Sequence, residues 1–196
     1  EDPVQNENIL LVELDEEIVE AYEGYPLPRD IYAQLINRTQ GIPGITVLMP
    51  DADIRGKEYD NTFAYAMSIK PTVLAQAAST QSDKISLHVG TSQLGEDPLP
   101  WLYEYPGILR TKPILQTTAK GLGLITATPE IDGVTRRIPL VVNVQSKLYP
   151  TFALELLRLA IDQPSYQLKT TTEGISWVRV PSYPLMNTDS NARIFL

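Results

Sequence analysis

Residues 45–78 read ITVLMPDADIRGKEYDNTFAYAMSIKPTVLAQAA, and the order of patterns in this stretch decides the fold class. It opens with the apolar run 45–49, which is typical of a buried strand. Apolar residues recur at helical spacing over 63–67, and Pro71 ends that helix before a second apolar run at 72–78. A strand, a helix and a strand in this order favour a parallel sheet that is covered by helices.

The residues before this stretch extend the same pattern towards the N-terminus. Residues 9–14, ILLVEL, predict another buried strand, and residues 31–36 have helical spacing. Gly41 and Pro43 end that helix, so the first part of the chain has the order β-α-β-α-β. Residues 1–8 are polar and contain a proline, and we interpret them as a linker.

The second half of the chain predicts a hairpin and one dominant helix. Asp132-Gly133 precedes the apolar residues 134–144, which is the pattern of a β-hairpin turn. Residues 151–162 are apolar around most of a helix, with a narrow polar stripe of Glu155, Arg158 and Asp162. The predicted fold class is α/β, a single domain with a mixed, partly parallel central sheet, flanking helices and a β-hairpin in the second half.

Composition excludes several classes of function. The 196 residues include 16 Lys and Arg against 24 Asp and Glu, a formal net charge of −8. This charge argues against nucleic-acid binding, which depends on cations that contact phosphates. Cysteine is absent and His88 is the one histidine, so thiol nucleophiles, disulfides and clustered histidine metal sites are excluded. We also find no run of about 20 apolar residues of the kind that spans a bilayer.

Acidic residues at strand ends are the first candidates for chemistry. Asp15 and Asp51 each follow a predicted strand, at the edge where parallel sheets bind ligands. With Asp53 they could hold Mg²⁺ or Ca²⁺, or share acid and base roles, so a metal-dependent hydrolase is the alternative function. Aspartate is also a common helix cap, and we favour that interpretation.

Arginines and aromatic residues supply the remaining candidates. Arg136 and Arg137 are expected on opposite faces of a strand, so that one can reach inward and pair with Asp15 or Asp51. The predicted polar network, structural before ligand-binding, comprises Asp15, Arg29, Asp51, Asp132 and Arg136. The aromatic loop 99–105 could instead bind a protein partner, or its rings could hold the loop to the core.

Five segments in order resemble the type 2 CHASE domain, a bacterial sensory module associated with cyclases and histidine kinases. They are Leu14-Asp15, Pro26-Leu27-Pro28-Arg29, the strand end at Asp51, residues 132–140 (DGVTRRIPL) and residues 149–155 (YPTFALE). The resemblance runs from Ile9 to Leu196. It implies a domain outside the cytoplasmic membrane, with membrane helices before and after it and a cytoplasmic cyclase or kinase as the output.

The resemblance also sets expectations for sites and partners. It supplies no catalytic residue, metal or cofactor, so we expect a domain that is not itself an enzyme. We expect residues 9–196 to form the sensor and the chain to be an excised ectodomain. The expected partners are an unidentified small-molecule or protein signal, the membrane through flanking helices, and, as an option, a second copy in a homodimer.

Overall fold

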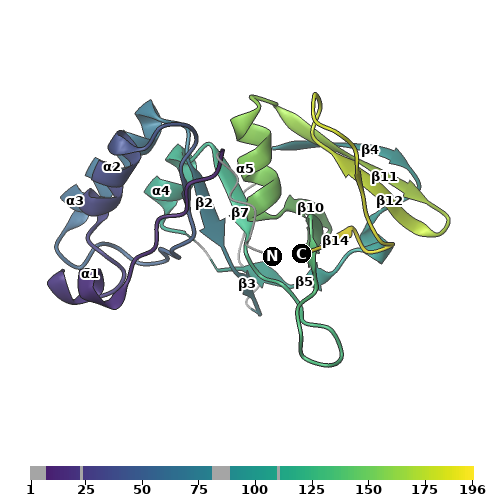
Figure 1. Cartoon of the computed structure of the whole chain (residues 1–196), viewed down its shortest axis with the longest axis horizontal. Helices are drawn as coiled ribbons and strands as arrows, with labels where there is room; N and C mark the ends of the chain where they lie inside the picture. The colour runs from purple at the N-terminus through teal and green to yellow at the C-terminus, as the bar shows by residue number, and fades with distance from the viewer. Residues whose placement is uncertain (1–7, 23, 81–88, 110) are drawn as a thin grey trace, which may run out of the picture.

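The computed structural model describes residues 8–22, 24–80, 89–109 and 111–196, in which helices pack against several small β-sheets (Figure 1). The predicted linker over residues 1–8, apart from its last residue, lies outside the described residues. His88, the one histidine, also lies outside them. Within the described ranges, no helix has the length and apolar character needed to cross a bilayer.

A three-stranded parallel sheet organises the first half of the chain. Its strands are β1 (Gly44–Ile45), β2 (Val73–Gln76) and β7 (Gly121–Leu124), in the order β1-β2-β7. Four helices accompany it and lie together at the left of Figure 1: α1 (Glu16–Ala21), α2 (Arg29–Arg38), α3 (Lys57–Ile69) and α4 (Pro113–Thr118). Their apolar faces and the sheet enclose the first core, which includes Leu27, Tyr32, Ile36, Phe63, Met67, Leu74, Leu115 and Leu122.

The rest of the fold contains four further small sheets. The largest has the order β13-β12-β11-β4, and only its β11–β4 pairing is parallel. These strands are β4 (Gly90–Gly95), β11 (Ser165–Thr171), β12 (Gly174–Arg179) and β13 (Met186–Asn187). A second sheet joins β5 (Glu104–Tyr105), β9 (Val141–Val144) and β10 (Lys147–Pro150). The two-stranded pairs are β14 (Arg193–Phe195) with β8 (Arg137–Pro139), and β3 (Ala78–Ser79) with β6 (Gly107–Ile108).

Helix α5 (Phe152–Ala160) lies between the helices α1–α4 and the sheet of β4, β11 and β12 in Figure 1. It packs on β7 and β2 on one side, while Leu154 and Leu157 contribute to the second core on the other. Glycines in these strands leave room for the helix. A Cβ atom added to Gly123 would lie 2.4 Å from the Cα atom of Phe152. Glycine therefore relieves crowding at this position.

The predicted fold class and the helices around residues 31–36, 63–67 and 151–162 are confirmed. The prediction of a buried strand over residues 9–14 is wrong. These residues form no strand and pair with no described strand, so Ile9 to Val12 are exposed. The run 45–49 also contributes fewer paired residues than expected, since β1 ends at Ile45.

The hairpin of the second half exists, but its turn lies at a different position. Asp132-Gly133 forms a turn without paired strands on both sides. The hairpin joins β9 to β10 through Gln145 and Ser146, which have φ angles of 52° and 60°. Two residues with positive φ match the twist of the flanking strands, even though this sequence lacks the usual Asn-Gly signal.

Candidate functional site

Three buried charged residues and one partly exposed lysine form what we call the Asp60 cluster: Arg29, Asp53, Asp60 and Lys112. Arg29 begins α2, Asp53 lies in the loop before α3, Asp60 is in the first turn of α3, and Lys112 precedes α4. One cluster thus joins three helices and a loop that are distant in sequence.

Asp60 is the centre of this cluster and is 1% exposed. Its Oδ2 atom lies 2.8 Å from Lys112 Nζ, and its Oδ1 atom lies 3.6 Å from Arg29 Nε. The backbone N–H of Asp53 donates to both of its oxygens at 3.3 Å. Two cations therefore face one buried carboxylate, and removing that carboxylate would leave both without their counter-charge.

Asp53 is the second carboxylate of the cluster and holds the start of α2. Its Oδ2 atom accepts the backbone N–H of Arg29 at 2.8 Å, and its Oδ1 atom accepts that of Arg55 at 2.9 Å. Burial alone would raise the pKa of Asp53, but these backbone bonds and the Arg55 guanidinium outweigh it and lower the pKa. Asp53 therefore stays ionised and acts as a capping group for a helix that Pro28 cannot cap.

A second group of charges, the Asp189 cluster, lies along β8 and β14. Its members are Glu130, Asp132, Arg136, Arg137, Asp189 and Arg193. Arg193 Nε lies 2.7 Å from Asp189 Oδ2, and Arg137 Nη1 lies 3.0 Å from the same oxygen. Arg193 Nη1 also donates to the Tyr103 hydroxyl at 3.0 Å. The cluster ties the last described strand to two other parts of the second half.

The expectation that one of Arg136 and Arg137 reaches inward to pair with Asp15 or Asp51 is wrong. Arg136 lies 3.5 Å and Arg137 lies 2.7 Å from the carboxylate of Glu130, so both belong to one cluster. Arg136 also pairs with Asp132 at 2.7 Å, and this bond lowers the pKa of Asp132. Both arginines are partly exposed, and among the described residues neither forms an ion pair with Asp15 or Asp51.

The structure brings the predicted site residues together only in two pairs, Arg29 with Asp51 and Asp132 with Arg136. Asp15 is exposed and caps α1 by accepting the N–H of Ile18 at 2.9 Å. Asp51 is exposed, and its backbone carbonyl accepts a hydrogen bond from Arg29 Nη2 at 3.3 Å. Within the described ranges, no group of three or more His, Asp or Glu residues is placed to hold a metal ion. Asp15, Asp51 and Asp53 therefore do not form the metal site that the hydrolase alternative requires.

Sequence reasoning missed a buried ion pair on α5. Glu155 and Arg158 were predicted as part of a polar stripe, yet they are 1% and 5% exposed. Arg158 Nε donates to Glu155 Oε2 at 2.6 Å, and Arg158 Nη1 donates to the carbonyl of Gln163 at 2.6 Å. The other oxygen, Oε1, has no hydrogen-bond partner among the described residues. Burial raises the pKa of Glu155, while Arg158 acts to lower it. The apolar residues on both sides of this stripe were the available signal that the stripe is buried.

The aromatic loop 99–105 is held to the core. Leu99 and Trp101, in the 3-10 helix η1 (Leu99–Trp101), pack against the second core, and Tyr103 and Tyr105 pack against a third, smaller one. The carbonyl of Trp101 also accepts a hydrogen bond from Asn191 Nδ2 at 2.6 Å. These contacts match the interpretation that the rings anchor the loop.

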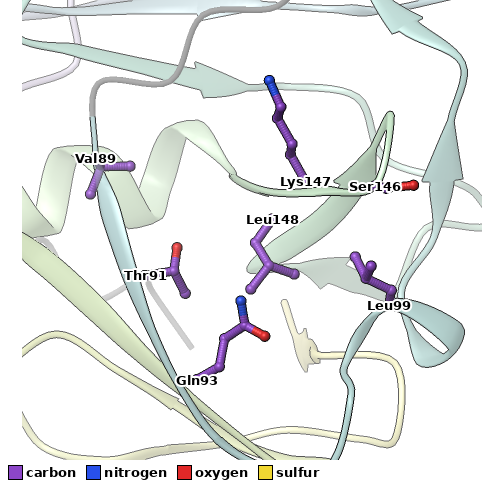
Figure 2. Close-up of a pocket in the computed structure, with 7 residues that line it drawn as sticks. All are labelled: Val89, Thr91, Gln93, Leu99, Ser146, Lys147 and Leu148. Carbon is purple, nitrogen blue, oxygen red and sulfur yellow. The ribbon is translucent and has the colours of Figure 1, made fainter.

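A hollow of about 290 Å³ lies between β4, η1 and the β9–β10 turn (Figure 2). Val89, Leu99 and Leu148 supply apolar walls, and Thr91, Gln93, Ser146 and Lys147 supply polar groups. Figure 2 shows the Gln93 and Leu148 side chains directed towards each other, while Lys147 extends away from both. None of the predicted site residues lines this hollow.

Comparison with known proteins gives one match. A family model described as the CHASE2 domain matches residues 2–195, which is essentially the whole chain. No curated protein and no solved structure matches the chain. The family match confirms the resemblance that the sequence motifs indicated.

Proposed function

The chain belongs to the CHASE2 domain family of extracellular sensory domains, and we propose that it is the input domain of a bacterial transmembrane receptor. The domain lies in the periplasm or at the cell exterior and is tethered by membrane helices that flank it. It passes a signal to a cytoplasmic adenylate or guanylate cyclase, histidine kinase or Ser/Thr kinase. The family match over residues 2–195 is the observation that carries this proposal.

The role proposed for the domain is to receive a signal and not to catalyse a reaction. Both carboxylates of the Asp60 cluster are engaged by cations or by backbone N–H groups. We therefore assign a structural role to Arg29, which bonds to the Asp51 carbonyl, and the role of a helix cap to Asp15. The hollow in Figure 2 combines apolar walls with a few polar groups, as small-molecule sites do, and supports a small molecule as the signal.

The Asp189 cluster supports a route by which a signal reaches the end of the domain. Arg193 on β14 is bonded to Asp189 and to Tyr103, and the backbone N–H of Leu196 donates to the Arg136 carbonyl at 2.9 Å. A shift of Tyr103 or of the loop before β8 therefore displaces β14. Transmission requires that the signal binds two arrangements of these groups with different free energies.

Arg193→Gln in the full-length receptor tests this route. The variant removes the ion pair to Asp189, and we expect basal output activity in isolated membranes to change by about fivefold or more. Arg179→Gln is the matched control, because the Arg179 guanidinium bonds to Gln167 on the neighbouring strand and not to a residue of β14. A changed melting temperature of the domain with unaltered output in Arg193→Gln would contradict the route.

A further inference from the structure

The chain exposes a short apolar segment near its N-terminus, which we call the arm: Ile9, Leu10, Leu11 and Val12. Their relative exposures are 73%, 80%, 88% and 56%. No backbone hydrogen bond to another described residue is formed by residues 9–14. Four consecutive aliphatic residues with an unpaired backbone are the composition of a strand that has no neighbour.

The base of the arm is fixed, although the arm itself is free. Leu14 packs against the first core, and Asp15 caps α1 through the N–H of Ile18. The arm therefore leaves the domain from a defined point. Single exposed aliphatic residues are ordinary on protein surfaces, but a contiguous run marks an interaction site.

The same chain carries a strand edge that lacks a neighbouring strand among the described residues. β1 is the outermost strand of its sheet, with Gly44 opposite Val73 and Ile45 opposite Leu74. The Pro43 carbonyl accepts the N–H of Val73 at 3.0 Å, so Pro43 and Ile45 present their backbone groups to β2. Because these groups alternate along a strand, those of Gly44 and Thr46 point to the outer side.

This outer edge is open in the described structure. Gly44 and Thr46 are both exposed, and their outward N–H and C=O groups form no hydrogen bond with any other described residue. The arm in its present position does not cover them. An unpaired edge of this kind is a template for a further strand.

We propose that the arm of one copy adds as a strand to the outer edge of β1 in a second copy, which extends the parallel sheet by one strand. Each copy has one arm and one open edge. In a dimer with a single twofold axis, the arm of each copy can therefore pair with the edge of the other. Hydrogen bonds between the paired backbones set the register of the added strand, and burial of the aliphatic side chains stabilises the dimer.

A bilayer is a poorer partner for the arm. Lipid tails cannot hydrogen-bond the backbone, so the unpaired N–H and C=O groups would stay unsatisfied. The arm is followed by Glu13, Asp15, Glu16 and Glu17, which an anionic membrane surface repels. The domain itself carries a net charge of −8.

Light scattering of the chain, with hydrogen exchange of the arm amides, tests the exchange. We expect a dimer at tens of micromolar concentration, with the amides of residues 9–14 protected, and dissociation in the variant Leu10→Asp/Leu11→Asp. Ile54→Asp is the matched control, because Ile54 is 100% exposed outside the arm, and it should remain a dimer. Circular dichroism checks that all variants are folded.

A crosslinking measurement identifies the partner of the arm. The chain has no cysteine, so chains carrying only Leu10→Cys and chains carrying only Thr46→Cys can be mixed and joined by a bismaleimide. The exchange predicts a mixed covalent dimer, and replacing Thr46→Cys by Ile54→Cys should abolish it. A chain that stays monomeric at all concentrations overturns the proposal. This holds whether its arm amides exchange freely or are protected because the arm pairs with the β1 edge of its own chain. Arm-dependent binding to anionic vesicles by a monomer would overturn it as well.

Discussion

Arg158→Met should lose about 3–5 kcal/mol of unfolding free energy at neutral pH, because it leaves the Glu155 carboxylate buried without its cation. The Oε1 atom of Glu155 already lacks a partner among the described residues, so the structure offers no replacement for the lost bond. Urea unfolding of the isolated domain measures the change.

The size of this loss should depend on pH. Burial raises the pKa of Glu155 above its unfolded value of about 4.3, and the bond from Arg158 limits that rise. Because the folded state binds this proton more tightly than the unfolded state does, protonation of Glu155 stabilises the fold. This stabilisation is complete below about pH 4.3 and is lost as pH rises through the pKa of the folded state. Without Arg158 the folded pKa rises further, so the loss in Arg158→Met should be smaller at pH 5 than at pH 8. Equal losses at both pH values would contradict the account.

A double variant controls for packing. Glu155→Leu/Arg158→Met removes both charges and keeps apolar side chains of similar length in the core. We expect it to recover most of the stability that Arg158→Met loses, because apolar groups often replace a buried ion pair without cost. If the double variant is as unstable as the single one, the loss comes from packing and not from the stranded carboxylate.

Asp60→Asn should also be strongly destabilising, by about 3 kcal/mol or more, since Arg29 and Lys112 then face each other without a buried counter-charge. Asp51→Asn is the matched control. Its carboxylate is exposed, so the free energy of unfolding should change by less than about 0.5 kcal/mol. Thermal or urea unfolding of both variants provides the comparison. If Asp60→Asn were as stable as Asp51→Asn while the full receptor lost its response, the cluster would be a ligand site and not a structural one.

Local pattern was sufficient for the helices and for several strands. The spacing of apolar residues and the stops at Gly41 and Pro71 predicted α2 and α3. The apolar run 72–78 predicted β2. In each case the signal and the structure depend on residues that are neighbours in sequence.

Features that depend on distant partners could not be predicted in the same way. Residues 9–14 have the composition of a buried strand, but whether such a run is paired depends on a neighbouring edge. In the β9–β10 turn, Gln145 and Ser146 have positive φ because the pairing of the two strands imposes this conformation. Neither residue is a glycine, so the sequence carries no signal for the turn. Tertiary context decided both outcomes.

The charged residues also divide into local interactions, which could be predicted, and long-range ones, which could not. Asp15 was predicted as a cap or a ligand, and the cap is confirmed because capping is a local interaction. Asp60 was missed because its partners, Arg29 and Lys112, come from other elements. Arg136 and Arg137 are neighbours in sequence, and their long side chains both reach Glu130. Alternation along a strand therefore could not determine their partners.

The proposal that this domain receives signals outside the cytoplasmic membrane is tested most directly by labelling intact cells. The chain has no cysteine, and Glu173 is exposed in the turn between β11 and β12, so Glu173→Cys in the full-length receptor provides a single reporter in this domain. A cysteine placed in the output domain of the same receptor is the control. We expect a membrane-impermeant maleimide to label Glu173→Cys on intact cells, and the control only after lysis. Labelling of Glu173→Cys only after lysis would contradict the account.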